Sequence, residues 1–330
     1  MGQTIMNWPA STPFFSSPER TAIAGIPLQT VHQSMVTGEE YLAYLRTVVE
    51  HYDLHPLLYH RVISARAQGA GGTGGRFQLT VEHRGTEKKF SCRNLIMAHG
   101  NMHAPRRLGV PGEDLEFVDN YHDDIHRYFR QNLLIVGGRN SAVEAAIRAW
   151  RGGARVTLMY RQPELTKEKL NSRYHLEISI LMQKERIRFL GSSEIREIRN
   201  DEISYLRNGK EETGTWDFVL LCTGFEKDLS LLHELGVKLN PDGEPVLNEP
   251  TMEANVPGLY FAGTSVSGGR DSYRQFVGTS HVHVEKILRS IAGENARAVT
   301  GDYFPRSYPF SRADIEPVEG KSVDENTADR

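Results

Sequence analysis

The chain has 330 residues, of which 39% are hydrophobic and 25% are charged, a composition that suits a globular protein with room for two domains. Its net charge of −3 argues against a nucleic-acid partner, and no apolar run approaches the ~20 residues of a membrane helix, so no membrane partner is expected. The two cysteines, Cys92 and Cys222, form no Cys-x-x-Cys pair, so we expect buried structural thiols and a reducing, cytoplasmic setting.

The first part of the chain predicts an irregular segment followed by one helix. The segment Met1–Phe15 has neither the basic start nor the apolar core of a signal peptide. Thr37 and Glu40 have the spacing of a capping box, which predicts a helix that runs to about His51. The expected buried face of that helix is Tyr41, Leu42, Leu45, Val48 and Val49.

A small antiparallel sheet is expected next. Two strand-like runs, Arg61–Ala67 and Arg76–His83, flank a glycine-rich turn at Gly69–Gly75, and Lys89–Cys92 adds a third strand. The apolar run Leu57–Val62 is a further strand candidate. Together these segments predict a meander.

A buried strand and a linker lead to the middle of the chain. The run Arg93–Gly100 is apolar and ends at a glycine, which predicts a strand. The following segment Ala104–Glu113 contains two prolines, and we expect it to cross from one part of the molecule to another.

The central segment Leu133–Arg148, followed by Ala154–Arg161, predicts a strand, a glycine turn, a helix and a second strand. This is the order of the opening βαβ unit of a dinucleotide-binding domain. Gly137 and Gly138 leave room at the turn for a pyrophosphate, whose charge suits the N–H groups of a helix start.

The residues after this turn carry more of the expected binding site. Asn140 and Ser141 can cap the helix and hydrogen-bond phosphate, and Ala142 is small enough for close packing of helix and strand. Arg139 stands where the strict G-x-G-x-x-G pattern has its second glycine. Its side chain either contacts phosphate or points to solvent.

The end of the second strand favours NADP(H) over NAD(H). An acidic residue at that place would accept hydrogen bonds from the ribose 2′-hydroxyl of NAD, whereas this chain has Arg161, with Lys167 and Lys169 nearby. An arginine can pair with a 2′-phosphate. The alternative is a solvated surface arginine.

The rest of the chain predicts further strands and one helix. The helix is expected from Tyr273 to about Ala292, and the residues 305–330 are expected to form a mobile tail. His281 and His283 lie two apart and cannot share a helix face, so no metal site is expected. The expected strands are Lys184–Leu190, Glu194–Ile198, Asp217–Gly224 and Asn255–Gly263.

Taken in order, these motifs resemble the bacillithiol-disulfide reductase family, a thioredoxin-reductase-like group of FAD/NAD(P)-dependent pyridine nucleotide oxidoreductases. Gly137–Ala146 is similar to the NADPH motif of that family, and Phe14–Glu19 is similar to its early Phe-Phe-Ser-x-x-Glu segment. Ala98–Gly100, Leu221–Phe225 and Asn255–Gly263 resemble its other strand ends. The resemblance covers about residues 7–295.

The resemblance implies an α/β fold with two Rossmann-like, three-layer dinucleotide-binding domains. The NAD(P) domain, residues 106–224, is expected to be inserted in an FAD-type domain made of residues 1–105 and 225–304, followed by the tail. FAD is implied beside NADP(H), with Gly100, Gly224, Gly263 and Thr264 at the flavin side. Thr264 replaces the Asp of the common Gly-Asp flavin motif, and Ala-His-Gly replaces Ala-Thr-Gly.

The resemblance also implies hydride transfer from NADPH to FAD and onward to a redox acceptor, either a small-molecule disulfide or a protein, in a chain that can form a homo-oligomer. The family's N-terminal FAD fingerprint, the first βαβ unit of that domain, is not found here. Its proposed redox cysteine belongs to that loop, so neither cysteine of this chain inherits the role, and no catalytic residue is assigned.

Two further interpretations stay open. One is a non-catalytic NADP(H)-binding remnant or fragment that cannot hold FAD alone. The other is a flavin monooxygenase or a ferredoxin–NADP reductase, which share the two-domain plan.

Overall fold

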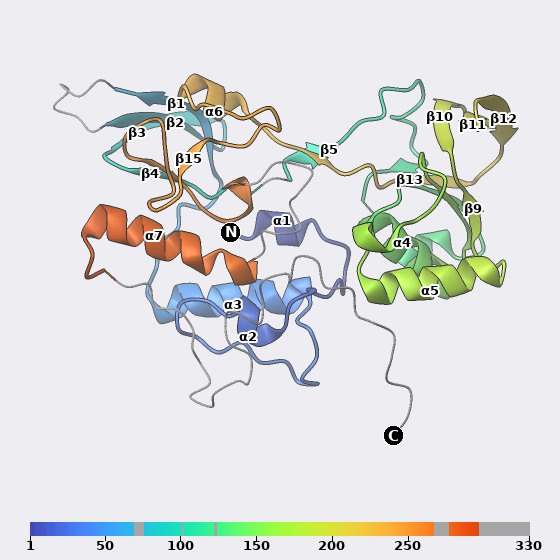
Figure 1. Ribbon diagram of the computed structural model, residues 1–330, viewed down its shortest axis with the longest axis horizontal. Helices are drawn as coiled ribbons and strands as arrows, with labels where there is room; N and C mark the ends of the chain where they lie inside the picture. Colours follow the sequence, from blue (N-terminus) through green and yellow to red (C-terminus); the bar gives the residue numbers. More distant parts are fainter. Residues whose placement is uncertain (69–75, 101, 122–123, 267–276, 297–330) are drawn as a thin grey trace, which may run out of the picture.

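The computed structural model describes residues 1–68, 76–100, 102–121, 124–266 and 277–296, which form two lobes (Figure 1). The central lobe contains the middle of the chain, and the terminal lobe contains both ends of the described sequence. The chain crosses between the lobes at β5 (Ala104–Pro105) and β14 (Phe225–Glu226), which pair antiparallel (Figure 1).

The central lobe is built on a five-stranded parallel sheet in the order β6-β13-β7-β8-β9. Parallel strands are covered on both faces, so their sequences are nearly continuous apolar runs, as Leu133–Val136 is here. The strands are β6 (Val118–Asp119), β7 (Asn132–Val136), β8 (Arg155–Met159), β9 (Arg188–Leu190) and β13 (Phe218–Leu221).

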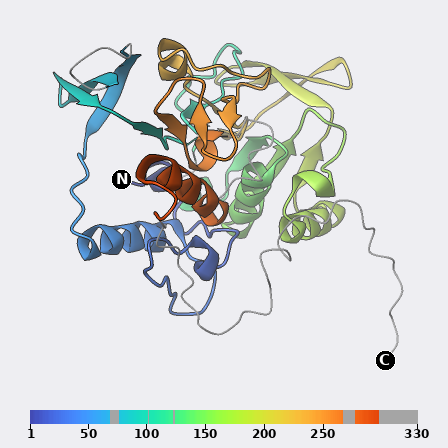
Figure 2. The same cartoon turned by 60° about the vertical axis from the view of Figure 1, so that its left-hand side comes forward.

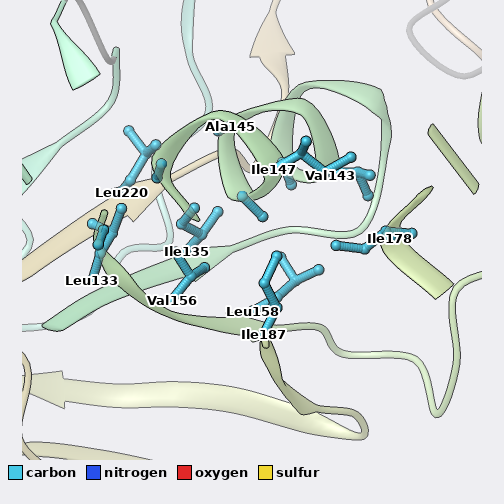
Figure 3. Packing of buried hydrophobic residues seen from close by; sticks show 14 of the residues in the cluster. Leu133, Ile135, Val143, Ala145, Ile147, Val156, Leu158, Ile178, Ile187 and Leu220 are labelled. Atoms are coloured by element: carbon cyan, nitrogen blue, oxygen red, sulfur yellow. The ribbon is translucent and has the colours of Figure 1, made fainter. Parts of the chain in front are cut away.

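Helices cover one face of this sheet. The helix α4 (Asn140–Arg151) packs against it through small residues such as Ala142, Ala145 and Ala149, which let helix and strands approach closely (Figure 3). The helix α5 (Ser172–Gln183) contributes the buried Ile178. The expected strand, helix and second strand of the central motif are therefore confirmed.

A second, antiparallel sheet covers the opposite face of the parallel sheet. It consists of β10 (Ser193–Ile198), β11 (Ile203–Arg207) and β12 (Lys210–Gly214). Only the first of these strands was predicted, and α5 was not predicted. The strand expected at Lys184–Leu190 is wrong in its first half, because α5 runs to Gln183 and β9 starts at Arg188.

In the terminal lobe, the predicted first helix is confirmed as α3 (Gly38–His51). Its capping box is complete, since Thr37 accepts from the Glu40 N–H and Glu40 accepts from the Thr37 N–H. Its buried face differs from the expectation: Tyr44 is buried, whereas the three residues Leu42, Leu45 and Val49 are only half-buried. The Tyr44 hydroxyl hydrogen-bonds the backbone of Ile23 and Ile26, so a polar contact selects this face.

The meander is also confirmed, as β1 (His60–Ala67), β2 (Phe77–His83) and β3 (Thr86–Cys92). The glycine-rich turn expected at 69–75 lies outside the described residues. The strand expected at Leu57–Val62 is wrong for its first half, since β1 starts at His60 and Leu57 is 61% exposed.

A four-stranded sheet completes the terminal lobe, in the order β15-β16-β17-β4. The predicted strand at Arg93–Gly100 is shorter than expected, because β4 covers only Leu95–Met97, and Ile96 is exposed. The strands β15 (Leu247–Asn248), β16 (Glu253–Ala254) and β17 (Leu259–Phe261) follow in the chain.

The remaining helices are α1 (Gln3–Met6), α2 (Pro18–Thr21), α6 (Ser230–Glu234) and α7 (His281–Ala292). Figures 1 and 2 show α7 between the β17 sheet and α3, and its Ile287 packs with Tyr260 of β17. The helix was expected from Tyr273; residues 273–276 lie outside the described residues, as does the expected tail at 305–330. Among the described residues, no helix has the length and apolar character needed to span a membrane.

Candidate functional site

The turn after β7 has no room for a side chain at its first residue, Gly137. Gly137 has φ +147°, and a β-carbon built on it would lie 2.5 Å from the Cys222 carbonyl oxygen and 3.0 Å from the Ala142 β-carbon. Only glycine fits between the end of β13 and the start of α4. Ala142 itself is buried, which agrees with the close packing that its size predicted.

Gly138 is covered by an aromatic ring. A β-carbon on Gly138 would lie 2.4 Å from the ring of Tyr160, the residue that directly follows β8. Sequence reasoning did not single out Tyr160, although its place at the end of the second strand was the available signal. The turn, the start of α4 and the end of β8 therefore meet at one place.

The start of α4 differs from the expected capping. The N-cap residue is Arg139, and no side chain caps the helix, so Asn140 and Ser141 as caps are wrong. The Asn140 Oδ1 instead accepts the backbone N–H of Asn171, at 2.8 Å, and thereby joins the N-termini of α4 and α5. The first N–H groups of α4 are left available for an anion, because a helix start has donors that its own turns do not use.

Basic side chains border the same edge of the sheet. Arg161 follows Tyr160 and is exposed, as are Lys167 and Lys169. Arg139 and Ser141 are also exposed, on the turn and the first turn of α4. The structure thus brings the predicted nucleotide residues of the central lobe to the carboxyl ends of β7 and β8.

The expected flavin-side residues meet in the terminal lobe. Gly100, with φ +77°, follows β4, and a β-carbon on it would lie 3.5 Å from the Thr264 Oγ1. β4 and β17 are parallel neighbours, so their carboxyl ends meet. Gly263 donates its N–H to the Nδ1 of the buried His283, at 3.1 Å. Burial lowers the pKa of His283, which keeps Nδ1 available as an acceptor.

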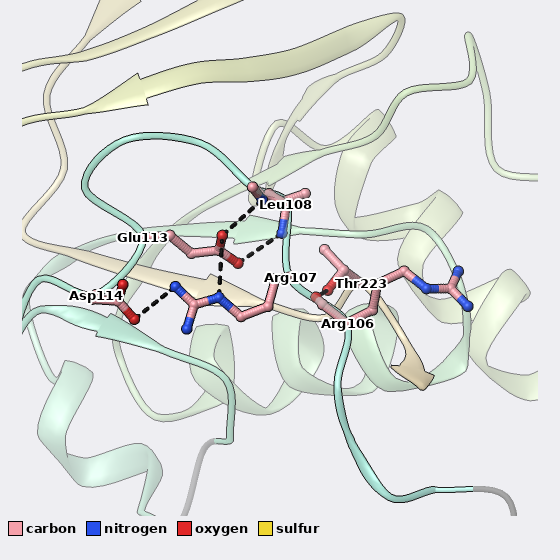
Figure 4. A network of polar contacts seen from close by, with 7 residues as sticks. Arg106, Arg107, Leu108, Glu113, Asp114 and Thr223 are labelled. Carbon is pink, nitrogen blue, oxygen red and sulfur yellow. Dashed lines mark hydrogen bonds and ion pairs between the residues drawn. The ribbon is translucent and has the colours of Figure 1, made fainter. Parts of the chain in front are cut away.

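Gly224 lies apart from that pair, at the crossing between the lobes. Its carbonyl accepts the Arg106 N–H at 2.9 Å, and the Thr223 hydroxyl donates to the Arg106 carbonyl (Figure 4). The crossing loop is fixed by Glu113, which is 3% exposed and accepts the N–H groups of Leu108 and Gly109. From the sequence, Ala104–Glu113 was interpreted as a linker, and Pro111–Glu113 as a motif similar to the family's Pro-Gly-Glu, but the role of the Glu113 carboxylate was not predicted.

The two lobes also touch away from the crossing. Arg148 of α4 donates to the Thr12 Oγ1, at 3.1 Å, and to the Ala10 carbonyl oxygen, at 2.5 Å. The Phe15 ring meets the Tyr174 ring of α5 at 5.9 Å between centroids. These contacts join the N-terminal segment to the two helices that flank the nucleotide turn.

Both cysteines are unpaired thiols, and both are half-buried rather than fully buried as expected. Burial raises the pKa of Cys222 to about 12 and also raises the pKa of Cys92. A thiol with a raised pKa is a poor nucleophile. In the part of the chain that the structure describes, no three His, Cys, Asp or Glu side chains gather as a metal site.

Comparisons with known proteins agree with this geometry. The sequence model described as pyridine nucleotide-disulphide oxidoreductase matches residues 1–263. Bacilliredoxin reductase Bdr of Bacillus subtilis (strain 168) is 30% identical over 292 residues, which cover 88% of this chain and 86% of that protein.

Solved structures share the two-lobed α/β fold. The bacillithiol disulfide reductase Bdr of Bacillus cereus superposes with a TM-score of 0.82 at 28% identity, over 88% of this chain and 87% of that one. The thioredoxin reductase of T. acidophilum gives a TM-score of 0.62 at 21% identity, over 82% and 86% of the two chains, and this likeness concerns the fold alone.

Proposed function

Because the chain belongs to the pyridine nucleotide-disulphide oxidoreductase family, we propose that it is a flavin-dependent NADPH oxidoreductase that delivers electrons to a disulfide or another redox acceptor. Residues 106–224 would form the NAD(P) domain, and residues 1–105 with 225–304 the FAD-type domain. The names of its relatives, a bacilliredoxin reductase and a bacillithiol disulfide reductase, support a disulfide as the acceptor.

The observation that carries the proposal is the cradle at Gly137, by which we mean the turn Gly137–Gly138 together with the start of α4. A β-carbon on Gly137 would strike the Cys222 carbonyl oxygen, so only glycine lets the turn after β7 pack this closely against the end of β13 and the start of α4. Such a tight glycine turn at a helix start is the arrangement that binds a pyrophosphate. The uncapped first N–H groups of α4 and the exposed hydroxyl of Ser141 would hold that pyrophosphate. Arg161 would pair with a 2′-phosphate, which favours NADPH over NADH.

The flavin side is supported by the two strand ends of the terminal lobe. Gly100 lacks a side chain beside the Thr264 hydroxyl, which leaves the backbone open there, and Thr264 would hydrogen-bond the flavin. His283 would fix the backbone at Gly263 as a neutral acceptor. These residues fit the flavin end of FAD. Gly224 lies at the crossing between the lobes, where we expect the two cofactors to meet.

When bound, NADPH and the flavin supply the redox chemistry, in which two electrons and one proton leave NADPH and one further proton completes the conversion of a disulfide into two thiols. The residues of this chain bind and orient the cofactors. A small-molecule disulfide and a protein disulfide are both acceptors of this chemistry. The proposal includes a cytoplasmic location, which the two unpaired cysteines support, and a homo-oligomer, which the family resemblance implies.

The alternative is a protein that binds NADP(H) without catalysis. It is favoured by one observation: in the described part of the terminal lobe, no α-helix directly follows a strand through a glycine turn as α4 follows β7. That lobe would then hold FAD weakly or only together with another polypeptide segment.

The visible absorbance spectrum of the purified chain tests the proposal. A flavin spectrum that bleaches with NADPH under anaerobic conditions, and returns when a disulfide is added, is the expected result. A colourless protein that binds NADP⁺ in calorimetry would establish the alternative. A protein that binds neither nucleotide nor flavin would contradict both.

A further inference from the structure

The order of strands in the central lobe divides its nucleotide edge into two halves. From β7 the chain moves to β8 and then β9 on one side, and it returns to the other side of β7 for β13, which also pairs with β6. Ligands of open α/β sheets lie across the carboxyl ends of the strands where the order reverses. Here the reversal is between β7 and β13, beside the cradle at Gly137.

A dinucleotide with its pyrophosphate on this turn therefore extends in both directions. One half lies toward the end of β8, where Arg161 is placed for the adenosine 2′-phosphate under the proposed function, on which this inference rests. The other half, the nicotinamide nucleotide, then lies toward the ends of β13 and β6.

Most of the side chains at the ends of β13 and β6 already have a partner within the protein. The Thr223 hydroxyl donates to the Arg106 carbonyl, and the Tyr121 ring packs against the Phe225 ring at 6.0 Å between centroids. Asn120, which follows β6, is different. Its Oδ1 is buried and has no hydrogen-bond partner in the described structure.

A buried acceptor without a donor is unfavourable and calls for a reason. The preceding side chain cannot be that donor, because Asp119 is a carboxylate and itself accepts from Tyr128 and Arg127. A ligand that supplies the partner of the Asn120 Oδ1 has to offer a hydrogen-bond donor, neutral or cationic. A primary amide is such a donor, and two amides can pair as donor and acceptor.

We propose that Asn120 binds the carboxamide of the nicotinamide ring, with its Oδ1 accepting the carboxamide N–H. The contact would fix the ring at the β6–β13 end of the crevice, while Arg161 fixes the other end of the dinucleotide. Asn120 is thus a cofactor-binding residue that distinguishes the nicotinamide half from the adenosine half.

Calorimetry on the purified full chain can separate the two halves. The ligands are NADP⁺, its adenosine half 2′,5′-ADP, and the 3-acetylpyridine analogue of NADP⁺, whose acetyl group has no N–H to donate. For the wild type, the analogue is expected to bind about tenfold more weakly than NADP⁺.

Asn120→Leu removes the acceptor and keeps the branched shape of the side chain. We expect NADP⁺ to bind about tenfold more weakly to this variant, with the affinities for 2′,5′-ADP and for the analogue within twofold of the wild type. The melting temperature without ligand should be unchanged or higher, because an unpaired buried polar group is replaced by an apolar one. Asn120→Asp keeps the acceptor and should retain most of the NADP⁺ affinity.

Thr223→Val is the matched control, because its hydroxyl at the neighbouring strand end already has a partner. It should lower the melting temperature and leave the ratio of NADP⁺ to 2′,5′-ADP affinity unchanged. Parallel losses of NADP⁺ and 2′,5′-ADP in Asn120→Leu, or no loss of NADP⁺, would overturn the inference. A wild type that binds neither ligand would instead overturn the proposed function, and the inference with it.

Discussion

The ring of Tyr160 lies over Gly138 so closely that a β-carbon on this glycine would come within 2.4 Å of it. Tyr160, which follows β8, thus covers the turn that follows the neighbouring strand β7. The space that a side chain on Gly138 would need is filled by the Tyr160 ring. The corresponding space at Gly137 is filled by the backbone of Cys222 at the end of β13.

Gly138→Ala is expected to lower the free energy of unfolding by about 1–3 kcal/mol, because overpacking forces the Tyr160 ring away. It should also weaken NADP⁺ binding, since the displaced ring lies at the nucleotide edge. Denaturant unfolding and calorimetry measure the two effects. The double variant Gly138→Ala/Tyr160→Ala should regain part of the free energy of unfolding that Gly138→Ala loses. Equal destabilisation of the single and the double variant would show that contact with the Tyr160 ring is not the cause.

Arg161→Asp is expected to weaken NADPH binding at least tenfold and to change NADH binding little, because only NADPH carries the 2′-phosphate. Binding of both nucleotides is measured by fluorescence titration. Arg196→Asp is the control: Arg196 is also exposed, but it lies on β10 of the other sheet. The role of Arg161 would be disproved by an unchanged preference for NADPH.

Arg148→Met is expected to loosen the N-terminal segment from the central lobe, because the two hydrogen bonds to Ala10 and Thr12 are lost. The stability should fall by about 1–2 kcal/mol, and limited proteolysis should cut earlier within the first residues of the chain. Arg151→Met, on the same helix, removes an ion pair to Glu177 within the central lobe and should not expose this segment. Similar cleavage of both variants would contradict the prediction.

Stability should decrease as the pH falls through the range in which His283 titrates. Its pKa is lowered in the folded protein by burial and by Lys286, so the unfolded chain binds more protons below the ordinary value of about 6.5. The contribution of His283 is complete above that pH and is lost as the pH falls toward the folded-state pKa. Thermal melts from pH 7.5 to 5.5 should therefore show a shallower decline for His283→Asn, which keeps an acceptor for Gly263.

Cys222 should resist alkylation in the folded protein, because its raised pKa leaves almost no thiolate near neutral pH. Mass spectrometry after brief iodoacetamide treatment should find Cys92 modified before Cys222. In denaturant the two should react alike. Preferential labelling of Cys222 in the native protein would mean that its thiol is accessible and activated.

The central motif was predictable because its signals are local. The apolar run of β7, the two glycines and the small residues of α4 follow one another within a short stretch, and each has a direct structural meaning. The capping box of α3 is local in the same way. The hairpin between β11 and β12 had a local signal too, since Asn208 and Gly209 form its turn with positive φ, and it was overlooked.

The remaining features depend on contacts between distant segments. α5 has an exposed Leu176 and Ile180, which obscure its buried face. Tyr44 is buried because its hydroxyl meets a loop some 20 residues away in sequence, and Asn140 binds the start of α5 rather than capping its own helix. The orphaned oxygen of Asn120 could not be read from sequence at all, because it is defined by missing neighbours.

The antiparallel pairing of Pro105 with Phe225 brings the two junctions of the central lobe together. A segment whose ends already meet costs its host little chain entropy, whatever its length. The central lobe can therefore be replaced as a unit during evolution. Recombination at these two junctions would exchange the domain that sets nucleotide specificity and leave the path of the chain through the terminal lobe unchanged.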